Sequence, residues 1–335
     1  MRYALLFLVL AACERPDATP SPRRPDPVLL DDRAALLPAM QVDSLTLTPI
    51  VAHGAIEPEE DLMTLDEAFA EKLVAIKELP SQTVNQLTLT NNASRPLFLL
   101  AGEVVIGGKQ DRIIGQNTII AANTTQAVPV FCVEHGRWNG ESQEFASGKA
   151  LAHGRLRGNA SFEGQSEVWS EVAAKNQLRQ TRNATDTYRQ VASQQTNGTI
   201  AALEMRIKAA LMRVNAADRE RMIGYVASIN GKVATIDRFN SPKLFRKLES
   251  KLVRSYLIES VDTPAAANVT APTVAEIKGF IAEPEQAAPE RAYDTDEAST
   301  IRYKSAKAAK ASVELKKKAE YLKKSKPVYE NYQAK

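Results

Sequence analysis

The chain has 335 residues and a formal net charge of +3, but this charge is unevenly distributed. Residues 301–335 carry a net charge of +8, which leaves −6 for residues 13–300. We expect no nucleic acid among the partners of this mildly acidic body. Three histidines and two cysteines occur without HxH, HExxH or CxxC spacing, so the sequence predicts neither a metal site nor a cofactor.

The N-terminus resembles a bacterial lipoprotein signal. Arg2 precedes an apolar run that is too short to span a bilayer, and the LAAC sequence that ends at Cys13 fits a lipobox. We therefore expect residues 1–12 to be a signal peptide and Cys13 to be acylated, for example with palmitate, which would hold the protein on a membrane. Glu14 follows the cysteine. By resemblance to Gram-negative lipoproteins, this favours the outer membrane, with the protein facing the periplasm.

Residues 13–39 are predicted to be a tether. The fourteen residues that begin with Glu14 include five prolines, and this composition cannot bury a core. Residues 40–262 alternate between strand-like and helix-like patterns. They predict an α+β domain, in which an antiparallel sheet or β-meander is packed with helices.

Local patterns predict several elements of this domain in chain order. A capping box at residues 64–67 begins a helix. Residues 84–135 predict a β-meander with short turns. The pair Asn230-Gly231 predicts a type I′ hairpin, and Pro242 marks the start of a longer helix.

The C-terminal part of the chain differs in composition from the predicted domain. Residues 263–300 are rich in alanine, proline and acidic residues and predict a loose linker. Residues 301–335 are rich in alanine and lysine, so we expect a basic helical tail. Such a helix is either solvated without fixed contacts or attracted to anionic lipid, lipopolysaccharide or an acidic protein partner.

Three motifs stand out within the predicted domain. AGEVVIGGKQDR (residues 101–112), VPVFCVEHGRW (128–138) and INGKVATIDRF (229–239) follow TLDEA (64–68). In this order they resemble a domain family named for its association with ADP-ribosylglycohydrolases and the rhodanese-phosphatase superfamily. The resemblance covers about residues 40–260. It implies a link to ADP-ribose or phosphoester metabolism but no particular reaction.

The first motif combines a glycine turn with cations. Its candidate ligand-binding residues are Gly107, Gly108, Lys109, Gln110 and Arg112. A glycine turn can form an anion-binding nest, and arginine can bind a phosphate or carboxylate through two hydrogen bonds. The spacing is not that of a P-loop, and the Ser or Thr after the lysine is missing. The alternative is a simple Gly-Gly hairpin turn between two strands.

Two glutamates are the candidate catalytic residues. Glu103 lies in an otherwise apolar strand, so its carboxylate requires a partner or has a raised pKa. It is either a member of a structural ion pair, with Arg112 or Arg137 as partner, or a site carboxylate. Glu134, at the end of the second motif's strand, is the other candidate for acid–base catalysis.

The second motif contains the only cysteine besides Cys13. Strand alternation places Cys132 on the same face as Glu134 and away from His135. Because free cysteine is commonly buried, we interpret Cys132 as an inert core residue, with a reactive thiol as the alternative. Glu134, Arg137 and Trp138 either bind a polar, ring-containing ligand or form an Arg–Glu pair in which the arginine packs over the tryptophan.

The third motif contributes Asp237, which we expect to accept a hydrogen bond from Ser241 or nearby N–H groups where the next helix begins. The sequence gives no positions for His53 and His153. Together these patterns favour a membrane-anchored bacterial lipoprotein that binds a small anionic ligand, nucleotide-like or ADP-ribose-like. One alternative is an assembly lipoprotein that recruits partners through its basic tail, and another is an envelope hydrolase that uses the two candidate glutamates.

Overall fold

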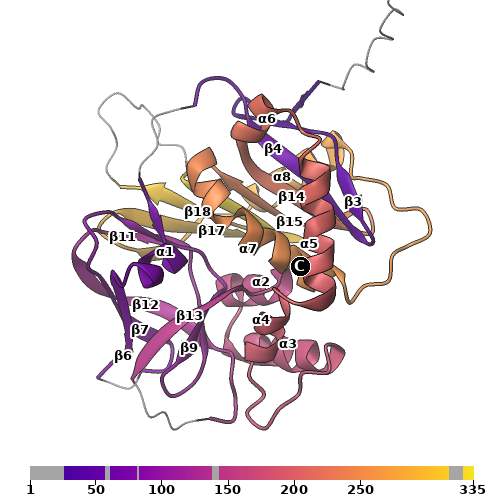
Figure 1. Ribbon diagram of the computed structural model, residues 1–335. Coiled ribbons are helices and arrows are strands. Elements are labelled where there is room, and N and C mark those ends of the chain that lie inside the picture. Colours follow the sequence, from indigo (N-terminus) through magenta and orange to yellow (C-terminus); the bar gives the residue numbers. More distant parts are fainter. Residues whose placement is uncertain (1–25, 57–60, 81–82, 138–142, 317–326) are drawn as a thin grey trace, which may run out of the picture.

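The computed structural model describes residues 26–56, 61–80, 83–137, 143–316 and 327–335. A closed barrel lies beside a large antiparallel sheet, and helices pack between and around them (Figure 1). This arrangement confirms the α+β class that the sequence predicts.

Six antiparallel strands from the first half of the chain form the barrel. In order around it they are β10 (Arg112–Ile114), β12 (Thr124–Cys132), β7 (Gln86–Asn91), β6 (Val74–Glu78), β13 (Glu144–Leu151) and β9 (Glu103–Gly107). Alternate residues point inward, so Val128 and Val130 of β12 meet Leu87 and Leu89 of β7 in an apolar interior. The predicted strands exist, but β7 pairs with β12 and not with the next strand in the chain, which departs from a simple meander.

A short sheet and helix α1 (Leu65–Ala70) accompany the barrel. The strands of this sheet, in order, are β11 (Thr118–Ile120), β8 (Leu97–Leu99) and β5 (Met63–Thr64). The predicted capping box is present, because Thr64 Oγ1 accepts a hydrogen bond from Glu67 N and the Glu67 carboxylate accepts one from Thr64 N. Leu65 and Ala68 of α1 therefore enter the apolar interior of the barrel.

The large sheet combines strands from both ends of the chain. Its strands follow the order β1 (Val28–Leu29), β2 (Ala34–Leu36), β4 (Leu45–Ala52), β14 (Met222–Ile229), β15 (Lys232–Phe239), β19 (Tyr329–Ala334), β18 (Ala308–Leu315), β17 (Ala298–Lys304) and β16 (Glu290–Asp294), and β3 (Met40–Val42) also pairs with β4. At its centre β14 and β15 form the predicted hairpin. Asn230 and Gly231 both have positive φ, 48° and 80°, as a type I′ turn requires.

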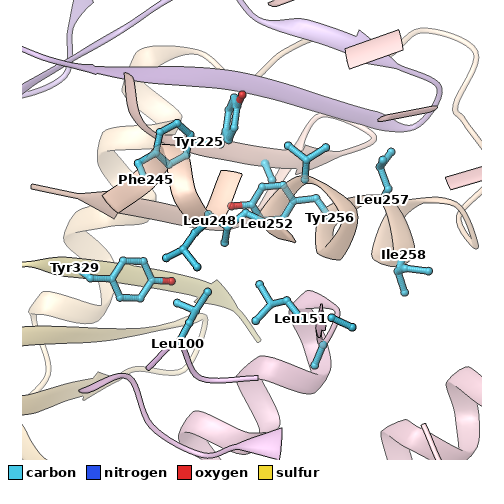
Figure 2. Close-up of a cluster of buried hydrophobic side chains, with 14 of the residues drawn as sticks. Leu100, Leu151, Tyr225, Phe245, Leu248, Leu252, Tyr256, Leu257, Ile258 and Tyr329 are labelled. Atoms are coloured by element: carbon cyan, nitrogen blue, oxygen red, sulfur yellow. The ribbon is translucent and has the colours of Figure 1, made fainter. Parts of the chain in front are cut away.

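The other helices follow the barrel in the chain. They are α2 (Gly154–Phe162), α3 (Gln165–Leu178), α4 (Arg189–Gln194), α5 (Gly198–Leu211), α6 (Ala216–Glu220), α7 (Pro242–Ser260) and α8 (Val274–Glu285). Helix α7 begins at Pro242, as predicted, and lies between the barrel and the large sheet. Its residues Phe245 and Leu252 share one core with Tyr225 of the sheet and Leu151 of the barrel (Figure 2). This shared core joins the barrel and the sheet.

The large sheet has two differently covered faces. On one face Tyr225 packs against α7, and Asp237 contacts α2 through a side-chain ion pair. On the other face Val226 and Ile236 pack against Ile277 of α8. Since alternate residues of a strand point to opposite faces, β14 and β15 each contribute to both layers.

The predicted linker at residues 263–300 is wrong, because this segment contains α8, β16 and the start of β17. Helix α8 begins with a capping box formed by Thr273 and Glu276, a T-x-x-E pattern that is present in the sequence. The apolar side chain of Ile277 then anchors the helix on the sheet. Ordered packing of one apolar face thus outweighs the linker-like composition.

The predicted helical tail at residues 301–335 is also wrong, because its described parts form strands of the large sheet. Alanine and lysine favour helices intrinsically, but strand pairing and burial override this preference. Ala311 is fully buried beside Phe162 of α2, where its small side chain fits. Lys310 is also largely buried, and its ammonium lies 2.9 Å from the Glu330 carboxylate. The described part of the tail is therefore structural and not a free basic helix.

The folded body begins before the predicted boundary at residue 40. Strands β1 and β2 pair with each other, and β2 is buried against β4. Residues 26–39 therefore belong to the fold and not to a tether. The lipobox and the remaining tether (residues 1–25), together with residues 317–326 of the predicted tail, lie outside the described residues.

Candidate functional site

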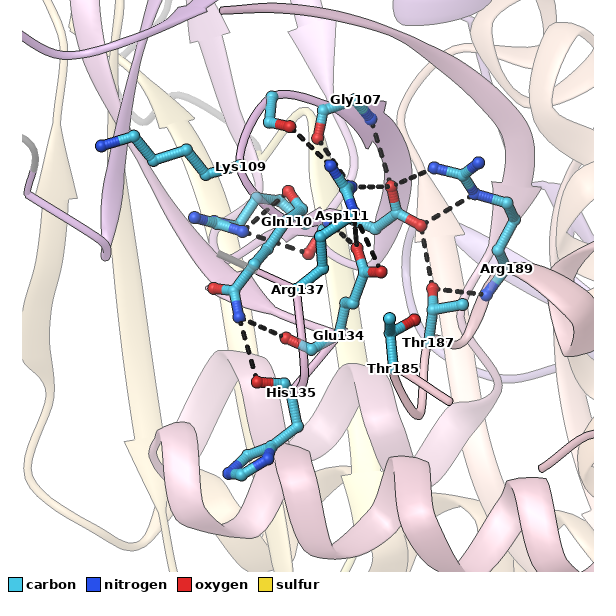
Figure 3. Close-up of polar contacts among 12 residues, drawn as sticks. Gly107, Lys109, Gln110, Asp111, Glu134, His135, Arg137, Thr185, Thr187 and Arg189 are labelled. Carbon is cyan, nitrogen blue, oxygen red and sulfur yellow. Dashed lines mark hydrogen bonds and ion pairs between the residues drawn. The ribbon is translucent and has the colours of Figure 1, made fainter. Parts of the chain in front are cut away.

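The first two sequence motifs meet in space, and we call their contact region the motif junction (Figure 3). It joins the β9–β10 turn, residues 107–111, to the segment that follows β12. Arg137 Nη1 donates to Gly108 O at 2.7 Å, and Arg137 Nη2 lies 2.8 Å from Glu134 Oε2. Asp111 N donates to the same Glu134 oxygen at 2.9 Å. The Arg–Glu pair that the sequence offered as one interpretation therefore exists.

The backbone N–H groups of the turn are bound by acceptors of the protein itself. Gly107 N donates to Asp111 Oδ1 at 3.1 Å, and Lys109 N donates to Glu78 Oε1 at 2.9 Å. A nest of this kind binds anions. Here the carboxylates of Asp111 and Glu78 occupy the position that the sequence analysis gave to a ligand.

Both glycines of the turn are explained by the hairpin geometry. Gly107 and Gly108 have φ values of +132° and +49°, which other residues rarely adopt. A Cβ atom on Gly107 would lie 2.5 Å from Glu144 O, and one on Gly108 would lie 2.3 Å from the Phe145 ring. The structure thus supports the hairpin interpretation of the GGKQDR motif.

Asp111 is the centre of the motif junction. Its buried carboxylate accepts hydrogen bonds from Arg189 Nη2 at 2.6 Å, Arg189 Nε at 2.9 Å and Thr187 Oγ1 at 2.8 Å. Arg137 Nη2 adds a longer contact at 3.4 Å. The hydrogen bond to Asp111 raises the pKa of Arg189. Sequence reasoning missed Asp111, because its cationic partners lie 26 and 78 residues away and leave no local pattern.

The other candidate residues of the two motifs are mostly buried. Gln110 Nε2 donates to Glu134 O at 2.8 Å, and Arg112 Nη1 donates to Gln110 O at 2.7 Å. Gln110, Arg112 and Glu134 are each at most 3% exposed. Lys109 points away from the cluster in Figure 3, and Trp138 lies outside the described residues. The side chains selected as ligand contacts therefore mainly hold the junction together.

Cys132 is a buried free cysteine. Burial raises the pKa of its thiol, although the nearby Arg112 guanidinium acts in the opposite direction. Since the thiolate is the reactive form, this environment keeps the group unreactive at neutral pH. The structure agrees with the interpretation of Cys132 as a core residue.

Glu103 forms an ion pair, but with a partner that the sequence analysis did not name. Its Oε1 lies 2.8 Å from Lys251 Nζ of α7, and its Oε2 accepts a hydrogen bond from Leu100 N. Lys251 also lies 2.6 Å from Asp66. Burial raises the pKa of the Glu103 carboxyl, whereas Lys251 lowers it. The expected partners, Arg112 and Arg137, are wrong because both bind within the motif junction.

A cavity of about 540 Å³ lies elsewhere, between α2, the C-terminal end of α7 and the large sheet. We call it the α2 cavity. Its lining includes neutral polar, apolar and charged side chains, among them Asn159, Phe162, Thr235, Glu259, Gln333 and Lys335. Small-ligand sites are typically concave, of several hundred Å³, and mostly apolar with a few polar groups. The α2 cavity has these properties.

A buried histidine supports the wall of the α2 cavity. His153 is the N-cap residue of α2, and its Nε2 lies 2.7 Å from Glu171 Oε1 and 4.0 Å from Glu259 Oε2. Its Nδ1 lies 2.9 Å from Tyr188 Oη. Burial alone would raise the pKa of Glu171, but its hydrogen bond with His153 and the nearby cations of Arg155 and Lys175 outweigh this effect, so this pKa is lowered. Glu259 also accepts a hydrogen bond from Arg155 N at 3.1 Å, which fixes its carboxylate at the cavity wall.

A second buried network lies beside the cavity and corrects the role of Asp237. Its carboxylate lies 2.9 Å from Arg157 Nη2 and accepts a hydrogen bond from Tyr256 Oη at 2.5 Å. Tyr329 Oη also donates to Asp237. The expected bond from Ser241 is wrong, because Asp237 lies within β15 and faces α2. Ser241 instead caps α7 with its own hydroxyl group.

The sequence held only a weak signal for the α2 cavity. Its residues come mainly from α2, α7 and five strands (β4, β14, β15, β18 and β19), which are distant in the sequence. The nearest local signal is HGRLRG, residues 153–158, where one histidine precedes two glycines spaced four apart in a helix. Glycine is unfavourable inside helices, so this spacing marks an unusual helix face.

Residues 34–325 match the ARG and Rhodanese-Phosphatase-superfamily-associated Protein domain, which confirms the resemblance in the motifs and extends it beyond residues 40–260. The chain belongs to this family. No curated protein and no solved structure matches it. Within the described residues, no helix is long and apolar enough to cross a membrane, and no cluster of His, Cys, Asp or Glu could hold a metal ion.

Proposed function

We propose that this member of the family is a membrane-anchored bacterial lipoprotein that binds a small ligand in the α2 cavity. The observation that supports this site is a volume of about 540 Å³ with a mixed polar and apolar lining. In the motif junction, by contrast, most polar groups bind one another, although Gln110 Oε1 and Arg112 Nε are buried without a partner among the described residues. We therefore assign the ligand to the α2 cavity and not to residues 107–138, which the sequence favoured.

The charges of the lining suggest how an anionic ligand would be oriented. Arg155 and Lys335 contribute the cations, and the side chain of Arg155 is 71% exposed. Glu163 and Glu259 also line the cavity, and Glu259 already accepts the hydrogen bond from Arg155 N, so an anion beside either carboxylate would meet a like charge. We therefore place the uncharged part of the ligand inside the cavity and its anionic part near Arg155, an arrangement that suits a nucleotide-like ligand.

Thermal unfolding with added ligands tests this site. We expect ADP-ribose, nucleotides or sugar phosphates to raise the unfolding temperature with concentration, because a ligand at 100 times its Kd stabilises the folded state by about 2.7 kcal/mol. Ala234→Phe should abolish the shift by filling the cavity, whereas Lys109→Ala in the motif junction should preserve it. The opposite result for the two variants would return the site to the motif junction.

Membrane anchoring requires a separate test, because Cys13 lies outside the described residues. If Cys13 is acylated, bacterial cells that express the protein and are grown with labelled palmitate will label the wild-type chain but not Cys13→Ser. The twelve residues between Cys13 and the first described residue could reach roughly 40 Å when extended. An unlabelled wild-type chain would contradict the lipid anchor but not the ligand site.

The two other functions suggested by the sequence have less support. Recruitment by a basic tail has less support, since the described parts of residues 301–335 form β17, β18 and β19 of the large sheet, while residues 317–326 lie outside the described residues. Hydrolysis by Glu103 or Glu134 would require a carboxylate that reaches a substrate. Both are nearly fully buried and held by Lys251 and Arg137.

A further inference from the structure

Helix α5 has an apolar outer face that nothing covers among the described residues. Its inward side chains join the core that it shares with α7, and they are Ile200, Leu203, Ile207 and Leu211. On the opposite side Met205 and Met212 are 65% and 87% exposed. Ala202 and Ala209, both exposed, lie between and beside them at the spacing of one helix face. We call these four residues the α5 stripe, and an exposed apolar surface of this kind indicates an interaction site.

Cations lie along both sides of the α5 stripe. With 3.6 residues per turn, Arg206 and Arg213 fall on one side of it and Lys208 on the other. Glu204, the only acidic residue of α5, is buried, and its carboxylate lies 2.8 Å from Lys208 Nζ. Arg206 also pairs with Asp43, but both side chains are exposed and such a pair contributes little. The outer face of α5 is thus apolar in the middle and basic at its sides.

Helix α5 lies at the edge of the large sheet where the chain enters the fold. It packs against β3, which pairs with the same edge of β4 as β2 does (Figure 1). Strand β1 is the outermost strand at this edge, and its Val28 and Leu29 are 52% and 49% exposed. Only twelve residues separate the first described residue from Cys13. An acylated Cys13 would therefore keep this edge within roughly 40 Å of a bilayer.

A lipid surface suits the α5 stripe better than a second copy of the chain does. If two α5 helices packed face to face, the cations of one would lie against the cations of the other, and like charges repel. A phospholipid surface offers phosphates to the cations and acyl chains to the methionines. Helices with an apolar face and a basic border bind in the plane of such an interface.

We propose that the α5 stripe and its flanking cations rest on an anionic phospholipid surface. Met205 and Met212 enter the boundary of the acyl chains, and the three cations reach lipid phosphates. This contact is weak by itself, but acyl chains on Cys13 strengthen it because they hold the helix close to the lipid. The inference rests on the proposed anchoring at Cys13, because it assigns the face that the anchored protein turns to the membrane.

A fluorescent probe on α5 tests the contact in the full chain. The Cys13→Ser chain has no acylation site, and its other cysteine, Cys132, is buried, so Ala209→Cys can be labelled selectively with nitrobenzoxadiazole. With vesicles of equal parts phosphatidylglycerol and phosphatidylcholine, we expect the emission to shift to the blue and nitroxide-labelled lipid to quench it. At least tenfold more lipid should be needed when the vesicles contain phosphatidylcholine alone. The same probe at Ala275→Cys, an exposed alanine of α8, should remain in water with both vesicles.

Paired variants separate the α5 stripe from the rest of the surface in vesicle sedimentation. Met205→Ser combined with Met212→Ser should weaken binding to the anionic vesicles about tenfold, whereas Val84→Ser, at another exposed apolar residue, should not. Arg213→Glu should weaken binding at least fivefold in low salt, because one cation near an anionic bilayer strengthens binding about fivefold. Lys278→Glu is the matched control on the exposed side of α8 and should weaken binding less than twofold. Equal losses for a variant and its control would overturn the inference.

The outcomes distinguish this inference from the anchoring on which it rests. If the α5 probe enters the vesicles but Cys13 is never acylated, the α5 surface stands and the lipid anchor fails. If Cys13 is acylated but the α5 probe remains in water, the anchor stands and the inference fails. If the chain sediments as a dimer that Met205→Ser dissociates, and vesicles bind neither form, the α5 stripe pairs with a second copy and the inference is wrong.

Discussion

The motif junction and the α2 cavity contain similar residue types but differ in how their polar groups are used. In the motif junction, the Asp111 carboxylate binds Arg189, Thr187 and Arg137, and the turn N–H groups bind carboxylates. In the α2 cavity, polar side chains such as those of Asn159 and Gln333 line open space of about 540 Å³. Two buried polar atoms of the junction, Gln110 Oε1 and Arg112 Nε, have no partner among the described residues. The two regions therefore differ mainly in open space, and this space favours the α2 cavity as the binding site.

Asp111→Asn should produce the largest effect and tests whether the motif junction is structural. We expect the free energy of unfolding to fall by about 3–5 kcal/mol, because the change removes the charge that pairs with Arg189 and Arg137 in a buried site. Urea denaturation measures this loss. Asp43→Asn is the control, since the Asp43–Arg206 pair is exposed and contributes little.

Ligand binding by the same variant gives the second half of this test. At a temperature where Asp111→Asn remains folded, its affinity for a ligand of the α2 cavity should equal that of the wild type. If stability is unchanged but binding is lost, the motif junction is the binding site and not a structural cluster.

Glu330 should give a smaller, pH-dependent effect on stability, because its buried carboxylate pairs with Arg33, Arg238 and Lys310. Burial alone would raise the pKa of Glu330, but Arg238, Lys310 and Arg33 outweigh it and lower the pKa to about 2. The unfolded chain therefore binds the proton at higher pH, near the ordinary value of 4.5. Glu330 thus contributes about 3 kcal/mol above pH 5, and this is lost as the pH falls from 4.5 to 2.

Urea denaturation between pH 2 and pH 6 tests the contribution of Glu330. We expect the stability of the wild type to fall more steeply than that of Glu330→Gln over this range. Parallel pH curves for the two proteins would show that the cluster does not hold Glu330 ionised.

Glu259→Gln should have a still smaller effect on stability, because this residue of the cavity wall makes few contacts that stabilise the fold. Glu259 Oε2 accepts one backbone hydrogen bond, from Arg155 N, which a glutamine carbonyl can also accept. We expect the free energy of unfolding to change by less than about 1 kcal/mol in urea. A loss as large as that of Asp111→Asn would mean that the cavity wall is as structural as the motif junction.

Much of the fold is predictable from local sequence signals. The capping box at Thr64, the hairpin at Asn230-Gly231 and the start of α7 at Pro242 all appear where predicted, because each depends on a few adjacent residues. The C-terminal strands were missed because their alanines favour a helix locally. Their strand conformation depends on pairing with β15, which is far away in the chain.

For the functional sites, as for the fold, the sequence showed local motifs but not the contacts between residues that are distant in the chain. The sequence singled out the two motifs that form the junction but did not show that they meet. Nor could it show that Asp111 and Glu78 bind the N–H groups of the glycine turn. The α2 cavity was missed because its lining residues are distant in the sequence, and one of them, Gln333, lies in a segment predicted to be a helix. Only the arrangement of β19 opposite α2 reveals it.

Arg155→Ala should give the smallest change in stability and tests where the anionic part of a ligand lies. Because this side chain is largely exposed, we expect the free energy of unfolding to change by less than about 0.5 kcal/mol. Affinity for AMP should fall a few-fold, and its dependence on salt should weaken, while affinity for adenosine stays constant. Arg213→Ala, at another exposed arginine, should change neither affinity. An equal loss for both ligands would place Arg155 against the uncharged part and reverse the orientation proposed for the ligand.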